Sequence, residues 1–114
     1  MLLQLKEKSN STIMNIYITQ LIYIKDEREN IFDQFESIAI PAIAKYNGKL
    51  LLRIRPKENG FIAHTIEKPY EIHLASFPTN EDFQLFMRDE ERKKFLHLKE
   101  DAIQSTVLIK GHEL

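Results

Sequence analysis

Arg53, Glu71 and His73 are the residues of this 114-residue chain whose types and spacing could do chemistry together. Each stands in a stretch with the alternation of a β-strand, in which residues two apart share one face. A guanidinium such as that of Arg53 can hold a carboxylate or an enolate through two parallel hydrogen bonds. A histidine such as His73 can act as a general base near neutral pH. We therefore take Arg53 and His73 as candidate catalytic residues and Glu71 as a ligand-binding neighbour.

Hydroxyl groups in an earlier alternating stretch extend this candidate set. Tyr17, Thr19 and Tyr23 share one face of that stretch and could donate hydrogen bonds to a small anionic or carbonyl-bearing ligand. Interface packing explains the tyrosines equally well, because Tyr is enriched at protein–protein interfaces. The corresponding alternative for Arg53 is an interface ion pair with Glu71.

Neither a metal nor a cofactor is expected. The chain has four histidines and no cysteine, and no two histidines show the i, i+4 spacing of a helical metal site. The three glycines, at positions 48, 60 and 111, stand alone rather than in a phosphate-binding loop.

Composition excludes other classes of function. Sixteen basic and seventeen acidic residues give a net charge of −1, so neither nucleic-acid binding nor attraction to an anionic membrane is expected. No apolar run approaches the ~20 residues of a membrane-spanning helix. The absence of cysteine fits a reducing compartment, and residues 1–10 lack the apolar core of a signal peptide. We expect a cytoplasmic protein.

The elements that must position these side chains follow the order strand, helix, strand, strand, helix, strand. This order predicts an α+β fold, the ferredoxin-like βαββαβ sandwich, with a four-stranded antiparallel sheet and two helices on one face. We assign residues 15–111 to this single domain and residues 1–14 to an N-terminal extension. The expected elements are strands at 15–24, 49–55, 70–77 and 103–110, and helices at 27–47 and 80–101.

Three local features are also predicted. Gly48 supplies the left-handed position that ends the first helix. Thr79 caps the second helix, with Asp82 three residues on. The charged run 88–94 is a solvated helix face, with a break near Asp89.

Alternation divides the strand residues into two faces. The more aliphatic set is expected to lie under the helices; it comprises Ile16, Ile18, Ile22, Ile24, Leu50, Leu52, Ile54, Ile72, Leu74, Ile103, Val107 and Ile109. The opposite set mixes aromatic, apolar and ionisable residues; it comprises Tyr17, Thr19, Leu21, Tyr23, Leu51, Arg53, Arg55, Glu71, His73, Ala75, Phe77, Gln104, Thr106 and Leu108. Such a face is too apolar to stay bare and too ionic for a dry core. We predict that a second subunit covers it and leaves a partly polar cavity.

Two segments resemble a known family. Residues 40–53 read Ile-Pro-Ala-Ile-Ala-Lys-Tyr-Asn-Gly-Lys-Leu-Leu-Leu-Arg, and residues 71–79 read Glu-Ile-His-Leu-Ala-Ser-Phe-Pro-Thr. Both are similar to signatures of the domain of unknown function thirteen-thirty family, in which Arg53 matches a strand arginine. The chain departs from the pattern at Asn47, where the family usually has glycine.

The resemblance implies the dimeric α/β-barrel superfamily, whose members pair two ferredoxin-like sheets face to face. They include cofactor-free monooxygenases, haem-degrading enzymes and lactone isomerases, so membership does not select a reaction. Two hypotheses stay open. In the first, a homodimer binds a small molecule, or acts on it as a cofactor-free enzyme, in the barrel cavity. In the second, the protein is a non-enzymatic dimerisation module with a filled interface.

Overall fold

The structure is a computed structural model that describes residues 15–114; the predicted extension, residues 1–14, lies outside the described residues. The elements are β1 (Ile16–Ile24), α2 (Glu29–Lys45), β2 (Lys49–Ile54), the 3₁₀ helix η2 (Glu58–Gly60), β3 (Glu71–Phe77), α3 (Asn80–Met87), α4 (Glu90–Lys94), α5 (Leu96–Ala102) and β4 (Ile103–Gly111).

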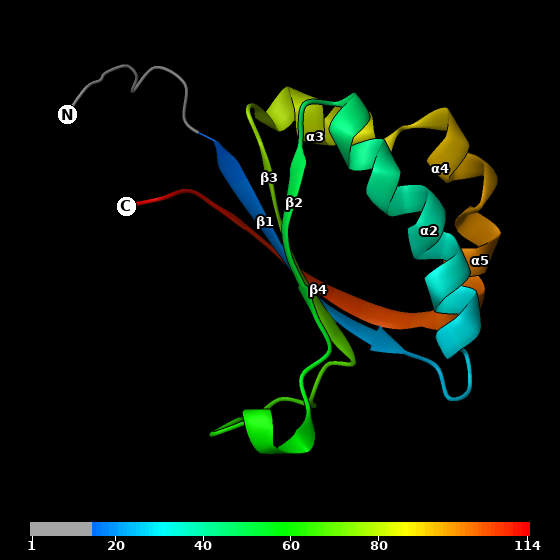
Figure 1. The fold of residues 1–114 in the computed structure, drawn as a ribbon, viewed down its shortest axis with the longest axis vertical. Helices are drawn as coiled ribbons and strands as arrows, with labels where there is room; N and C mark the ends of the chain where they lie inside the picture. The colour runs from blue at the N-terminus through cyan, green and yellow to red at the C-terminus, as the bar shows by residue number, and fades with distance from the viewer. Residues whose placement is uncertain (1–14) are drawn as a thin grey trace.

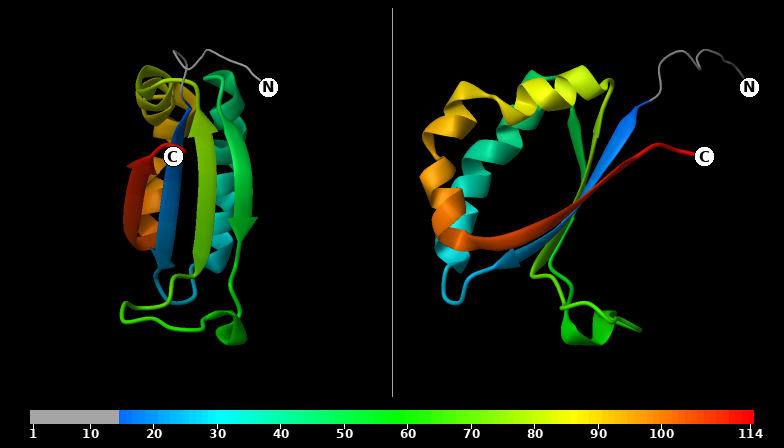
Figure 2. Two further views of the ribbon diagram at one scale, coloured as in Figure 1. Left: turned by 90° about the vertical axis from the view of Figure 1, so that its left-hand side faces the viewer. Right: turned by 180° about the vertical axis from the view of Figure 1, so that it is seen from behind.

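The four strands form one antiparallel sheet in the order β2-β3-β1-β4. All the α-helices lie on one side of it, and the other face is open (Figures 1 and 2). The predicted α+β, ferredoxin-like architecture is confirmed. Among residues 15–114, no helix is long and apolar enough to cross a membrane.

The α2 helix ends differently from the prediction. Asn47, with φ of 65°, takes the left-handed position assigned to Gly48, so that assignment is wrong. Gly48 is needed for space instead, because a Cβ there would lie 2.5 Å from Cε1 of Phe77 and 2.7 Å from Cγ2 of Ile43. The glycine lets the chain enter β2 directly against the core.

The predicted second helix is three short helices. Thr79 caps α3 as expected, since its side-chain oxygen accepts a hydrogen bond from the amide of Asp82 at 3.0 Å. The predicted break occurs at Asp89, which accepts from the amide of Arg92 at 2.9 Å and so starts α4. Asp89 and Arg92 are both buried, so the interpretation of the charged run as a solvated face is wrong at these two positions.

The face assigned to β3 is also wrong. The register pairs Ile18 with Ala75, Gln20 with His73, and Ile22 with Glu71. Because Ile18 and Ile22 pack under the helices as predicted, their partners on β3 face the helices too. Glu71 and His73 therefore lie inside the sandwich rather than on the open face.

A β-bulge reverses the phase of β2. Leu50 pairs with Ala75, but Leu52 rather than Leu51 pairs with Leu74, so alternation shifts by one residue. Arg53 then pairs with His73 and points to the helix side, contrary to the prediction. Simple alternation cannot anticipate the extra residue.

The face predicted for Val107 and Ile109 of β4 is wrong as well, because they pair with Leu21 and Thr19. The open face is therefore more apolar than predicted. Tyr17, Thr19 and Tyr23 do lie on it. We define the open-face patch as its apolar members: Leu21, Leu52, Ile54, Ile72, Leu74, Val107 and Ile109. Leu52, Ile54, Val107 and Ile109 are 44%, 40%, 44% and 52% exposed.

Candidate functional site

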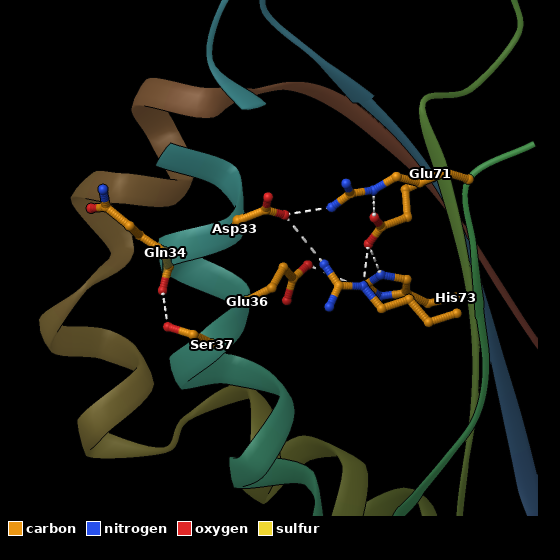
Figure 3. A network of polar contacts seen from close by, with 8 residues as sticks. Asp33, Gln34, Glu36, Ser37, Glu71 and His73 are labelled. Carbon is orange, nitrogen blue, oxygen red and sulfur yellow. Dashed lines mark hydrogen bonds and ion pairs between the residues drawn. The ribbon is translucent and has the colours of Figure 1, made fainter. Parts of the chain in front are cut away.

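A buried carboxylate organises the site. Glu71 on β3 is 0% exposed, and its two oxygens accept hydrogen bonds from the Nε atoms of Arg53 and Arg55, at 2.7 and 2.6 Å. Nε2 of His73 lies 2.5 Å from the Oε2 atom. Figure 3 shows Glu71 and His73 pointing from the sheet towards Glu36 and Asp33 of α2. The bulge in β2 matters here, because it turns Arg53 towards Glu71.

The charge of Glu71 is fixed by these contacts. Burial alone would raise the pKa of this carboxyl, but hydrogen bonds from His73, Arg53 and Arg55 outweigh burial and lower its pKa to about 2. Glu71 is therefore an ionised acceptor at neutral pH.

His73 is oriented by that acceptor. Because the Glu71 carboxylate can only accept, the Nε2 atom of His73 carries a proton and donates it. In the neutral imidazole, Nδ1 then holds the lone pair, and it lies 4.0 Å from Oε2 of Glu36. A buried carboxylate that fixes the tautomer of a histidine is the arrangement that prepares an imidazole for proton transfer.

Glu36 of α2 is a site residue that the sequence interpretation missed. It is only 6% exposed, and burial raises its pKa despite the nearby positive charge of Arg53. A signal was present, because Glu36 falls at helical spacing within the stripe Phe32, Phe35, Ala39 and Ile43. An acid on such a stripe must be buried.

Asp33 closes the network on the solvent side. Its Oδ1 atom lies 2.5 Å from Nη2 of Arg55 and 3.5 Å from Nη2 of Arg53. Arg55 also lies over the ring of Tyr70, with its guanidinium carbon 4.9 Å from the ring centroid. Glu71 and Asp33 thus hold the two arginines in place. The predicted role of Arg53 as a ligand clamp would depend on its Nη1 group, for which no hydrogen bond or ion pair is found among residues 15–114.

A cavity of about 60 Å³ lies beside His73, between the sheet and the helices. Its polar lining consists of Gln20, Glu36, His73, Arg92, Lys99 and Thr106. Its apolar lining includes Ile18, Phe35, Ala39, Ile43, Phe77 and Phe86. The sequence predicted a cavity between two sheets, whereas this one lies inside a single protomer.

Donor atoms suited to a metal also meet here. One ligand atom each from Glu36, Glu71 and His73 lies within 4.8 Å of the others. However, the Glu71 oxygens already accept from Arg53, Arg55 and His73, and such bonds compete with a cation. The donor set fits an ion-pair network better than a metal centre.

The predicted hydroxyl ligands are elsewhere. On the open face, the Tyr17 hydroxyl donates to Glu113 at 2.8 Å and the Tyr23 hydroxyl donates to the carbonyl of Glu67 at 2.7 Å. Thr19 lies on the same side. The structure therefore brings Arg53, Glu71 and His73 together and separates them from Tyr17, Thr19 and Tyr23.

Comparison with known proteins supports the fold. No family model and no curated protein matches the chain. A protein of unknown function from Rhodopseudomonas palustris is similar in structure, with a TM-score of 0.76, 14% identity, and coverage of 89% of this chain and 83% of that one. A NIPSNAP family protein of unknown function from Agrobacterium tumefaciens has a TM-score of 0.62 and 17% identity, covering 89% and 88%.

A dimeric protein of unknown function with a ferredoxin-like fold, from Bacteroides fragilis, has a TM-score of 0.64 and 10% identity, covering 87% of this chain and 96% of that one. At these identities the likeness establishes a ferredoxin-like fold and no more.

Proposed function

We propose that this protein is a homodimer in which each protomer binds a small organic molecule in the cavity beside His73 and exchanges a proton with it. The observation that carries the proposal is the buried triad of Glu71, His73 and Glu36. Glu71 holds the imidazole in one tautomer, and the pKa of Glu36, raised by burial, favours a form that can give up a proton inside the protein. Such a pair needs neither a metal nor a cofactor to move a proton.

Dimerisation through the open-face patch is the second part of the proposal. Four strands about 4.8 Å apart and roughly 26 Å long give a face of about 500 Å² in projection. This approaches the ~800 Å² of accessible surface that each partner buries in a standard interface. The dimeric ferredoxin-like protein from Bacteroides fragilis supports a dimer for this fold. The pairing would be that of a dimeric α/β barrel, in keeping with the resemblance to the thirteen-thirty family, and the cysteine-free composition fits a cytoplasmic location.

An interaction module without chemistry is the alternative function. The apolar character of the open-face patch favours it, because such a patch can serve association alone. The two functions differ at His73, which the module does not need.

Proton exchange is the direct test. Small carbonyl compounds and acids would be screened by NMR for protein-dependent exchange of their α-hydrogens with D₂O. We expect wild type to catalyse exchange in at least one compound and His73→Gln to reduce it at least ~100-fold. His97→Gln, at an exposed position on α5, is the matched control and should behave as wild type. Exchange that is equal in wild type and His73→Gln would exclude the proton-transfer role.

A further inference from the structure

Arg92 of α4 is a buried cation without an ionic partner in the part of the chain that the structure describes. The residue is 7% exposed, and its Nη1 atom donates to the carbonyl of Met87 at 3.1 Å. Its guanidinium carbon lies 5.7 Å from the ring centroid of Phe35 and 5.4 Å from that of Phe86. Its Nε atom is buried with no hydrogen-bond partner among residues 15–114. Burying an unsatisfied donor of a charged group is costly, so this atom needs an explanation.

Hydrogen bonds to Asp89 fix the start of α4 and with it the position of Arg92. Asp89, which accepts from its backbone amide, is fixed in turn by the Tyr46 hydroxyl at 2.7 Å and by Nζ of Lys45 at 3.2 Å. Two residues at the end of α2 therefore set where α4 begins and where the guanidinium enters the core.

A second cation faces the same cavity. Lys99 of α5 lines it with Arg92, and none of the ion pairs within residues 15–114 involves its ammonium group. Burial and the charge of Arg92 lower the pKa of Lys99, while burial raises the pKa of Glu36, the acid across the cavity. Arg92 and Lys99 thus face Glu36, an acid whose ionisation is itself disfavoured. The other carboxylate near Arg92, that of Asp89, already accepts hydrogen bonds from Lys45 and Tyr46, so an anion in the cavity would add the negative charge that the two cations lack.

A groove at the edge of the sheet adjoins this cavity. An open groove of about 390 Å³ runs between α5 and β4. Its lining shares Lys99, Ile103 and Thr106 with the inner cavity, so Lys99 stands where groove and cavity meet. Beyond the charged groups, the cavity wall is aliphatic and aromatic, which suits a short hydrocarbon portion.

We infer that Arg92 and Lys99 form a carboxylate-binding site, and that the ligand of the inner cavity is a small organic carboxylate that enters along the groove between α5 and β4. The inference deepens the proposed function, since it names the class of molecule held beside His73. The edge formed by Nε and Nη2 of Arg92 offers the parallel donors that a carboxylate accepts. The cavity of about 60 Å³ limits the buried part to a few heavy atoms.

Binding of simple carboxylates tests the inference. Acetate, propionate and pyruvate would be compared with propionamide and inorganic phosphate at constant ionic strength, with thermal unfolding as the readout. At ten times its Kd, a carboxylate should raise Tm by about 6 °C or more, whereas propionamide should leave it unchanged. If phosphate alone raises Tm, or if amide and acid act equally, the assignment to carboxylates is overturned.

Three variants locate the site. Lys99→Gln and Arg92→Met should each weaken carboxylate binding by about tenfold or more, the loss expected for a hydrogen bond between charged groups. Lys94→Gln, on the exposed side of α4, is the matched control and should bind as wild type. Lys99 forms no ion pair in residues 15–114, so its variant should fold even if Arg92→Met does not. Unchanged binding in Lys99→Gln would overturn the inference.

Binding and hydrogen exchange, measured on wild type and on His73→Gln, separate this inference from the proposed function. If both proteins bind carboxylates but wild type catalyses no hydrogen exchange, the anion site stands and the proton-transfer role fails. If neutral carbonyl compounds undergo His73-dependent exchange while carboxylates do not bind, the proposed function stands and the anion site fails.

Discussion

Replacing Glu71 by Gln tests the charge network at its centre. Glutamine keeps the size of the side chain but removes the charge that Arg53 and Arg55 share. Breaking a buried ion pair typically costs about 3–5 kcal/mol. Arg53 and Arg55 have side chains that are 33% and 44% exposed and can be rehydrated, so we expect a loss near the lower end, about 3 kcal/mol at pH 7.

The pH dependence gives an independent magnitude. A carboxyl whose pKa falls from 4.5 to about 2 on folding contributes about 3 kcal/mol to stability. Because the folded pKa of Glu71 is the lower one, this contribution is present above pH 4.5 and is lost as the pH falls from 4.5 towards 2. The cost of Glu71→Gln should therefore shrink over the same interval.

Urea unfolding followed by circular dichroism, at pH values from 2.5 to 7, measures this difference. Several protein concentrations are needed, because association would add to the apparent stability. Glu90→Gln is the control, since the side chain of Glu90 is 88% exposed. If the difference between wild type and Glu71→Gln is the same at pH 2.5 and pH 7, the reasoning on Glu71 is refuted.

Three further changes address other parts of the molecule. Glu36→Gln should raise the free energy of unfolding at neutral pH, because the raised pKa of Glu36 in the folded protein makes wild type lose stability as the pH rises above 4.5. Urea unfolding at pH 5 and pH 8 checks this. If the free energy of unfolding changes equally between the two pH values in wild type and in the variant, the prediction is contradicted. Gly48→Ala should cost about 1–3 kcal/mol, because its Cβ would overlap Phe77, and a fall in Tm of less than ~4 °C would show that the core yields. Leu52→Glu should convert the proposed dimer to monomers, as measured by size-exclusion chromatography with light scattering. Ile62→Glu, at a loop position that is 99% exposed, is the control and should leave the dimer intact. A dimeric Leu52→Glu variant would place the interface elsewhere.

The order of elements could be predicted from the sequence because it is encoded locally. Thr79 and Asp82 mark the start of α3 within four residues, and the apolar stripe of α2 repeats at helical spacing. Asn47 shows the limit of such signals, because asparagine tolerates the left-handed conformation that glycine favours. The left-handed position was assigned to the neighbouring Gly48, whereas the structure requires a glycine there because a Cβ would overlap Phe77.

The sides of the strands could not be predicted in the same way. Alternation shows which residues of a strand share a face, but it does not show which face lies under the helices. Choosing the more aliphatic face as the buried one fails when charged side chains are buried together and neutralise one another. Glu71 is tolerated inside because Arg53 and Arg55 meet it, and this depends on contacts between strands. The open face of β3 carries Ile72 and Leu74, so apolar side chains lie on the face to which alternation had assigned Glu71 and His73.

The site residues that were missed differ in how visible they were. Glu36 interrupts an apolar stripe and could have been recognised from its spacing. Arg92 lies in a charged run that reads as solvated, and only the turn at Asp89 carries it into the core. Its burial follows from tertiary structure, which no local pattern records.

The bulge at Leu51 implies that β2 could pair with β3 in two registers, one with the bulge and one without it. Its sequence, Lys-Leu-Leu-Leu-Arg-Ile, would also satisfy a straight pairing, in which Leu52 and Ile54 turn inward and Arg53 turns to solvent. As β2 is an outer strand with a single neighbour, only its pairing with β3 would have to be remade. The Glu71 carboxylate favours the bulged form, because only that form brings Arg53 to it. A buried acid on β3 thus determines the register of β2.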